Sequence, residues 1–398
     1  MNNDQSLSAL DVLAFIPNDI LDNFALDSKV DVQVKKLKGR TILLLFLYAA
    51  LNFKTISQRI LATIYTSDPF KLLFESNKKT IKFSAISMRL GSIKTGYFEN
   101  IFNYLVNSKQ VSSVCFSETK IGVEKLDSTF LGLSSKLLKV GMDMNPGRKN
   151  LKFGTVLSSG IPVYIELFTK NSDISEDKVF PKLLREKQEK KVVNINIFDR
   201  GMHKRESYVR LNHEQINFIT RAQSNTHIEV IDEVKLEKQE TATLINLKEQ
   251  RIKFKDFTLK NISKEHLEFR LIIGTNKNTK ETFRFITNVN FLTAEEITDL
   301  YKSRWEIETF FKFIKQELNF KHLLSRNENG IKAVMYLTMI TAILLTIYKK
   351  VNRVVGWAIT KFKFMEDLQR AIMTNWAPQV LQALDDGRSL LQTQRLSG

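Results

Sequence analysis

The feature that most constrains the fold is a change in the hydrophobic pattern after Ser117, where helical periodicity is replaced by short apolar runs. Lys125–Leu133 mixes β-branched and apolar residues over the length of a strand. Two further runs, Phe153–Leu157 and Ile161–Phe168, are separated by Ser158-Ser159-Gly160, which predicts a hairpin. This part of the chain is therefore expected to pair its strands into a sheet.

Helix and strand signals then alternate. Asp173–Lys191 is charged in the manner of an exposed helix, and Val192–Phe198 is a continuous strand. Residues 203–217 suit a short helix, and Phe218–Ala222 suits another strand. The order of three strands, helix, strand, helix and strand predicts an α/β fold with a mixed, ribonuclease-H-like sheet, in which an antiparallel hairpin leads into a parallel crossover.

The segments on either side of this region have different hydrophobic patterns. Residues 1–115 carry apolar residues at helical spacing, and the helix pair expected around Gly91–Gly96 is as typical of an ordinary bundle as of a helix-turn-helix DNA reader. Residues 226–290 alternate apolar and charged residues and predict a β-rich insertion. Thr293 is expected to cap a helix that continues through Phe320, and helices fill the remainder.

The charge of the chain favours a polyanionic partner. Sixty lysines and arginines against 43 aspartates and glutamates give a net charge of +17. Such a surplus suits binding to nucleic acid, although a merely soluble basic protein has the same composition. The single cysteine, Cys115, excludes an internal disulfide and a multi-cysteine zinc site, and it fits a reducing compartment.

No segment is expected to cross a membrane. The N-terminus lacks the basic start and apolar run of a signal peptide. Thr41–Leu51 is shorter than the roughly 20 residues that a bilayer requires. Val334–Tyr348 is also short and is flanked by Lys332 and Lys349. We expect both to be buried core helices of a soluble, cytoplasmic protein.

Two aspartates stand where the predicted sheet would bring them together. Asp127 lies within the first strand, and Asp199 directly follows the strand Val192–Phe198. In a sheet of this order the two strands are neighbours, and α/β proteins usually build their sites at such strand ends. Each aspartate taken alone would suit a turn or a helix cap equally well.

A further set of residues is spaced along the predicted helix that follows Thr293. Tyr301, Arg304, Glu308 and Lys315 are separated by gaps of three, four and seven, which would place all four within an arc of about 60° on an α-helix. A solvated charge stripe has a similar composition but does not require the tyrosine. The other face carries apolar residues that we expect in the core: Ile307, Phe310, Phe311, Ile314 and Leu318.

This spacing resembles the YREK signature of the transposases of the insertion-sequence-four family. Leu126-Asp127-Ser128-Thr129 and Phe198-Asp199-Arg200-Gly201 resemble the two aspartate motifs of that family, in the same order. The resemblance covers roughly residues 115–345. It implies a ribonuclease-H-like catalytic core with a β-strand insertion before the glutamate, an N-terminal DNA-binding domain and a C-terminal helical region used in dimerisation.

The resemblance also sets the expected domain boundaries. Residues 1–115 would be the DNA-binding domain, 116–225 and 291–345 the catalytic core, 226–290 the insertion, and 346–398 the C-terminal helical region. The dimer contact is expected around Trp376–Leu391, where apolar residues recur.

The implied activity is cut-and-paste transposition of an insertion sequence. Asp127, Asp199 and Glu308 would bind two Mg²⁺ ions, with Mn²⁺ able to substitute, because carboxylates suit hard cations. The expected steps are nicking, hairpin formation, hairpin opening and strand transfer. The expected partners are double-stranded DNA, as transposon inverted-repeat ends and as target, and a second copy of the chain.

Further residues are expected to contact DNA. Tyr301, Arg304 and Lys315 would hold phosphates near the transposon end. Arg200 and Arg221 are candidates for contacts with the DNA backbone. The alternative is that they are ordinary surface or strand arginines. Relatives place a tryptophan on the strand before the YREK helix to stack on a flipped base. This chain has no tryptophan there. When the strand Thr282–Asn288 is aligned by its Thr-Asn end, Phe283 takes that position and Phe285 is the second candidate. The alternative for both phenylalanines is a role in the core.

Three other classes of protein are alternatives to a transposase. A metal-dependent nuclease or resolvase on the same fold would cut DNA without joining it. A DNA-binding remnant would bind without Mg²⁺ and without cleavage. A tyrosine recombinase is disfavoured, because Tyr301 precedes the arginine and no histidine–arginine pair stands upstream.

Overall fold

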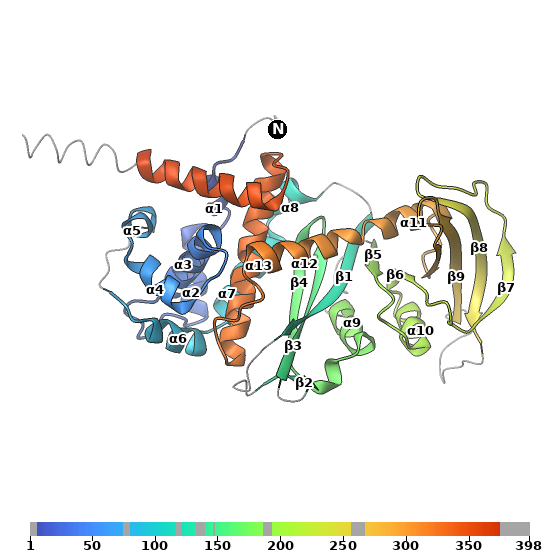
Figure 1. Cartoon of the computed structure of the whole chain (residues 1–398), viewed down its shortest axis with the longest axis horizontal. Helices are drawn as coiled ribbons and strands as arrows, with labels where there is room; N and C mark the ends of the chain where they lie inside the picture. The colour runs from blue at the N-terminus through green and yellow to red at the C-terminus, as the bar shows by residue number, and fades with distance from the viewer. Residues whose placement is uncertain are drawn as a thin grey trace, which may run out of the picture. The chain divides into compact units, whose positions relative to one another are not determined.

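The structure is a computed structural model that describes residues 6–74, 80–116, 121–132, 140–145, 148–185, 193–255 and 267–374 (Figure 1). The chain forms two compact units. One, here the helical unit, comprises Met1–Cys115 and Phe313–Gly398; the other, here the sheet unit, comprises Phe116–Lys312.

The sheet unit is built on one mixed sheet with the strand order β2-β3-β1-β5-β6-β10-β9-β8-β7, and β4 pairs with β3. β1 pairs antiparallel with β3 and parallel with β5, and β5 pairs parallel with β6. The strands are β1 Ile121–Gly132, β2 Met142–Asn145, β3 Arg148–Ser158, β4 Ile161–Phe168, β5 Val193–Phe198, β6 Asn217–Arg221, β7 Ile228–Val234, β8 Leu244–Phe254, β9 Glu268–Asn276 and β10 Thr282–Thr287.

This topology confirms the predicted α/β, ribonuclease-H-like fold. The predicted hairpin is the β3–β4 turn, where Ser159 and Gly160 both have positive φ, as a tight two-residue hairpin requires. The helices of the sheet unit, with the last one continuing into the helical unit, are η1 Asn171–Asp173, α9 Glu176–Arg185, α10 Arg205–His213, α11 Ala294–Lys302 and α12 Trp305–Glu317.

The sheet is packed on both faces. One face forms a cluster with α9 and α10, to which β5 contributes Phe198. The opposite face forms a cluster with α11, to which β5 contributes Ile195 and Ile197. Burial on both faces explains why most residues of β5 are apolar, and the buried Asn196 within it donates to the Asn217 carbonyl at 3.0 Å.

The predicted β-rich insertion is also confirmed. β7 to β10 pair antiparallel in sequence order, and β10 continues the sheet by pairing with β6. Its central strands are joined to the entry of α11 by a buried charge. The Arg270 guanidinium pairs with Glu249 on β8 and donates to the carbonyl oxygens of Val289 and Leu292.

The expectation of one continuous helix from Thr293 to Phe320 was wrong. Thr293 does cap α11 through a capping box, but α11 ends at Lys302 and α12 begins at Trp305. The Ser303 hydroxyl donates to the Leu300 carbonyl at 2.6 Å, and the Arg304 amide donates to the Tyr301 carbonyl, three residues back. These bonds replace the helical i to i−4 pattern and turn the chain. Tyr301 and Glu308 therefore lie on different helices.

The five apolar residues that were predicted to face the core are all at most 6% exposed: Ile307, Phe310, Phe311, Ile314 and Leu318.

The helical unit is organised around the long helix α13, Glu328–Val351, which packs on α3, α6, α7 and α8. The predicted helix pair around Gly91–Gly96 is α6 and α7. Residues 357–374 are also helical. The other helices are α1 Ala9–Leu13, α2 Asn18–Asp27, α3 Gly39–Asn52, α4 Gln58–Thr66, α5 Asp68–Phe74, α6 Phe83–Ser92, α7 Gly96–Asn107 and α8 Lys109–Cys115.

α13 belongs to the same compact unit as the N-terminal helices, and the assignment of residues 291–345 to the catalytic core stays a prediction. The two units divide within α12, between Lys312 and Phe313. The expected dimer segment, Trp376–Leu391, lies outside the described residues.

Both apolar segments that raised the question of a membrane are core helices, as predicted. α3 is buried along most of its length. Among the described residues, α13 alone is long and apolar enough to cross a bilayer, and 89% of its most apolar window is buried inside the protein.

Candidate active site

Asp127 and Asp199 occupy matching positions on neighbouring parallel strands. β1 and β5 are in register at Lys125 and Ile197, and each aspartate lies two residues beyond this pair. Each aspartate accepts a hydrogen bond from the next backbone amide, Ser128 at 2.7 Å and Arg200 at 2.8 Å. The sheet therefore brings the two carboxylates to the same edge, as the sequence predicted.

Tyr301 connects α11 to this edge. Its hydroxyl donates to Asp199 Oδ1 at 3.2 Å, and its ring packs 5.0 Å from Phe285 on β10. The side chain is 8% exposed, and burial raises the pKa of the phenol, which keeps it a hydrogen-bond donor.

Glu308 is held by Arg304. Arg304 Nη2 donates to Glu308 Oε1 at 2.6 Å, and the two side chains are 14% and 35% exposed. The buried Nε of the same guanidinium has no hydrogen-bond partner among the described residues. One donor of Arg304 is thus committed to Glu308, and its Nε is buried without a partner among the described residues.

The electrostatics show that negative charge is crowded around Asp127. Burial raises the pKa of Asp127 to about 7. The Ser128 amide and Arg304 oppose this shift, whereas the carboxylates of Glu176 and Asp199 add to it. A cation bound here would relieve that repulsion.

Glu176, in the first turn of α9, is a residue that sequence reasoning missed. Its Oε1 accepts a hydrogen bond from Ser128 Oγ at 3.2 Å. A Cβ added at Gly201 would lie only 1.1 Å from Glu176 Oε2, so the carboxylate occupies the space of a side chain at that position. Burial raises the pKa of Glu176, and the charge of Asp199 adds to the shift. The signal available in the sequence was the glycine two residues after Asp199.

The donor chemistry fits a hard divalent cation. The acids are oxygen donors only, and burial, with the neighbouring carboxylate charges adding to it, raises the pKa of Asp127. Within the part of the chain that the structure describes, however, no three acidic, histidine or cysteine side chains form a ready-made metal-binding group. The Glu308 carboxylate is paired with Arg304.

Two further predicted residues are Lys315 and Arg200. Lys315 is half-buried on α12, about two turns beyond Glu308 and so on the same face of that helix. Arg200 is exposed directly after Asp199.

Arg221 and Phe283 form a pair of their own. The Arg221 guanidinium lies 4.2 Å over the ring of Phe283 and pairs with Glu281 at 2.9 Å. Phe283 is half-buried, and its ring meets Phe285 edge-on at 6.2 Å, whereas Phe285 is 2% exposed in the core. Of the two phenylalanines, only Phe283 offers an accessible ring.

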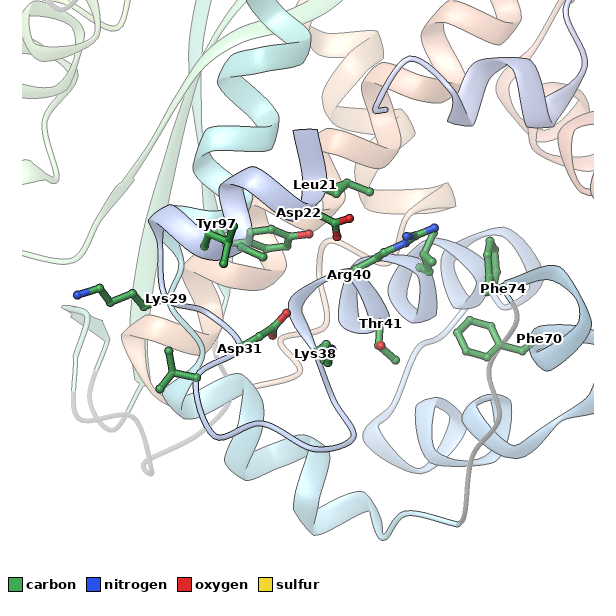
Figure 2. A pocket seen from close by; sticks show the side chains of 14 residues that line it. Leu21, Asp22, Lys29, Asp31, Lys38, Arg40, Thr41, Phe70, Phe74 and Tyr97 are labelled. Atoms are coloured by element: carbon green, nitrogen blue, oxygen red, sulfur yellow. The ribbon is translucent and has the colours of Figure 1, made fainter. Parts of the chain in front are cut away.

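A separate cavity of about 670 Å³ lies in the helical unit (Figure 2). It is lined by charged and aromatic side chains, including Arg40, Asp22 and Phe70, and by Tyr97, whose buried hydroxyl has no hydrogen-bond partner among the described residues. It contains none of the predicted site residues, so the candidate chemistry belongs to the sheet unit.

Comparison with known proteins identifies the family of the chain. A family model described as "Transposase DDE domain" matches residues 126–345. A Synechocystis sp. protein assigned as the transposase of insertion sequence element IS4SA is 27% identical over 279 residues, which are 67% of this chain and 72% of that protein.

Two other bacterial relatives match shorter stretches. A Sinorhizobium fredii protein assigned as transposase y4zB is 28% identical over 160 residues, 40% of this chain and 43% of its own length. A Geobacillus stearothermophilus protein assigned as the transposase of insertion sequence element IS5377 is 34% identical over 76 residues, 19% of this chain and 20% of its own length. The family match spans more than half of the chain, carries both aspartates and includes Glu308, so this chain belongs to the family of transposases with a DDE domain.

Proposed function

We propose that the chain catalyses cut-and-paste transposition of an insertion sequence by metal-dependent phosphoryl transfer. Transposase DDE domains generally use divalent metals. The observation that carries the proposal is the matched placement of Asp127 and Asp199 on adjacent parallel strands, beside Arg304 and its partner Glu308.

In this proposal Asp127, Asp199 and Glu308 hold two Mg²⁺ ions, which Mn²⁺ can replace. When bound, such a pair of ions activates the attacking oxygen and stabilises the leaving oxygen of an in-line displacement at phosphorus. Glu308 first gives up its pairing with Arg304. The guanidinium donor that held Glu308 is then free to turn towards a DNA phosphate.

Other side chains would hold the DNA. Tyr301, Arg304 and Lys315 contact phosphates at the transposon end, and Arg200 adds a backbone contact from beside Asp199. Arg221 and Phe283 form a platform on which a base flipped from the DNA end stacks, since one face of the Phe283 ring is covered by Arg221 and the ring is half-buried. The net charge of +17 supports a DNA partner of this kind.

The proposed reaction order is nicking, hairpin formation, hairpin opening and strand transfer into target DNA. Two copies of the chain would bring the two transposon ends together. Residues 1–115 are proposed to bind DNA and residues 346–398 to support the dimer.

The test uses a plasmid in which the chromosomal sequences flanking the gene bracket a marker. Asp127→Asn, Asp199→Asn and Glu308→Gln should each lower Mg²⁺-dependent cleavage about 100-fold or more, because each removes a ligand charge from the site. Binding of the flanking DNA should change little in a gel-shift assay.

Asp299→Asn is the matched control, because Asp299 is an exposed acid on α11 close to Tyr301. It should cleave like the wild type. Substantial Mg²⁺-dependent cleavage by any of the three site variants would refute the assignment of that residue.

A further inference from the structure

We propose that Lys125 is a positioning residue, which ties the first turn of α12 to β1 and so places Glu308 relative to Asp127. This inference rests on the proposed function, because it concerns the glutamate of the same site. It follows from an ion pair between a strand and a helix of the sheet unit. The Lys125 ammonium donates to Oε2 of Glu306, two residues before Glu308, at 3.2 Å.

Lys125 occupies a buried position of the sheet where its neighbours are apolar. Its side chain is 6% exposed. Across the sheet it stands between Leu157 on β3 and Ile197 on β5, which are both fully buried. Val123, two positions earlier on the same face of β1, packs against the apolar cluster that includes α11. The lysine therefore interrupts an apolar face at the position next to Asp127 on that face.

The ion pair is a weak source of folding stability. Of the acids that the structure describes, only Glu306 pairs with Lys125, and its side chain is 49% exposed. The desolvation of a buried charge offsets much of the attraction within such a pair, so apolar residues of similar size often serve the fold as well or better. A role in placing α12 accounts for a charge that the core does not require.

Two contacts with the sheet hold the segment of α12 that carries Glu308. Two residues before it, the ion pair ties the helix to β1. Three residues after it, the Phe311 ring meets Phe153 of β3 edge-on, with the ring centroids 6.4 Å apart. Phe153 stands opposite the residue two positions after Asp127, whereas the ion pair is formed two positions before it. The contacts therefore lie on either side of Asp127 along β1 and of Glu308 along α12.

The ion pair also lies where the chain needs an anchor. α12 starts directly after the turn at Ser303, where bonds to carbonyls three residues back replace the helical pattern. The direction of α12 is therefore not a continuation of α11, and its first turn depends on its contacts with the sheet. A displacement of about 1 Å in a catalytic group can lower a rate about 100-fold.

The experiment separates catalysis from stability. Lys125→Met removes the charge and keeps a long, apolar side chain, while the half-exposed Glu306 stays in contact with water. The variant should unfold at the temperature of the wild type or higher. Its single-turnover rate of cleavage of the flanking duplex should nevertheless fall about 10–100-fold, with the DNA concentration for half-maximal rate unchanged. A merely structural role would not lower the rate alone.

Hydrogen exchange, followed by mass spectrometry, adds a measurement that does not depend on cleavage. In Lys125→Met, amides of the first turn of α12 should exchange about tenfold faster, whereas the strands of the sheet keep their protection. Lys253→Met is the matched control, because Lys253 on β8 also pairs with a glutamate, at 3.0 Å, but is 47% exposed. It should match the wild type in cleavage and in the exchange of α12.

A second variant tests the pair itself. If Lys125 acts through Glu306, adding Glu306→Ala to Lys125→Met should change the rate by no more than about twofold. A further loss of about tenfold would show that the two residues act independently and would overturn the inference. If Lys125→Met does not fold, Glu306→Ala alone decides. It breaks the pair from its half-exposed side and should lower the rate about tenfold or more.

The outcomes separate this inference from the proposed function. If Glu308→Gln cleaves like the wild type, the proposed role of Glu308 fails. If Glu308→Gln is inactive but folded Lys125→Met cleaves at the rate of the wild type, only the role of Lys125 is overturned. A loss of rate in Lys125→Met that comes with a matching loss of thermal stability would also overturn it, because the lysine would then be structural.

Discussion

Lys315 has a natural control three residues away on the same helix. Lys312 is exposed on α12, whereas Lys315 is half-buried on the face of Glu308. If Lys315 neutralises a DNA phosphate, Lys315→Ala should weaken binding to DNA ends of any sequence. It should also reduce the slope of log K against log salt by about 1.

The measurement is fluorescence anisotropy of a duplex with the sequence flanking the gene, titrated at several salt concentrations. Lys312→Ala should leave the slope close to that of the wild type. A slope that stays unchanged in Lys315→Ala would show that the lysine is a structural or solvated side chain.

Phe283 is the residue proposed to stack on a flipped base. Unstacking a base costs a few kcal/mol, and an aromatic platform returns about 1–3 kcal/mol. Phe283→Ala should therefore slow hairpin formation about tenfold or more while sparing the first nick. The two products are separated on denaturing gels.

Phe285→Ala is the comparison, because Phe285 lies in the core and contacts Tyr301. It should lower thermal stability and impair both steps. If Phe283→Ala behaves in the same way, Phe283 is a core residue and not a platform.

Individual residues differed in how far the sequence revealed them. Asp127 and Asp199 could be placed from the sequence, because strand order and strand ends fix their positions along the sheet edge. Glu176 could not. Its helix begins with an ordinary acidic first turn, and only the three-dimensional approach to Gly201 distinguishes it from a residue that favours the helix dipole.

At the scale of elements, the turn between α11 and α12 shows a limit of periodicity. Apolar spacing continues through residues 294–318 as if the helix were unbroken. At the break, the amides of Ser303 and Arg304 donate to the carbonyls three residues back, and the Ser303 hydroxyl also donates to the Leu300 carbonyl; none of these bonds alters the apolar spacing. The helical conformation of residues 294–317 was predictable, and the division into two helices was not.

The buried pair of Glu249 and Arg270 should be a major determinant of how the insertion is anchored. The two side chains are 6% and 13% exposed. Glu249→Gln would leave the Arg270 charge buried and unpaired, which costs about 3–5 kcal/mol. Amides of β8 and β9 should then exchange hydrogen much faster, as measured by mass spectrometry of the full chain.

The control is a surface pair of the same insertion, Lys277 and Glu240, in which the glutamate is 70% exposed. Glu240→Gln should change exchange little, because exposed pairs contribute about 0–1 kcal/mol. Equal protection in the two variants would mean that the buried pair contributes no more than the surface one.

At the scale of the whole molecule, the proposed working unit is a dimer on two DNA ends. The apolar residues of Trp376–Leu391 are its proposed contact. A chain that stops after Asn375 should bind a single flanking duplex normally but fail to pair two duplexes. Native gels with two fluorophore-labelled ends report this, and efficient pairing by the shortened chain would rule the segment out.

The division of the chain into units has a consequence for its birth on the ribosome. The sheet unit is one uninterrupted stretch, Phe116–Lys312, whereas the helical unit needs α13, which is translated after it. Domains fold as units while synthesis proceeds from the N-terminus. The helices up to Cys115 therefore complete their unit only after α13 has been synthesised. If translation ends early or shifts frame shortly after Lys312, the product contains the whole sheet unit together with an incomplete helical unit.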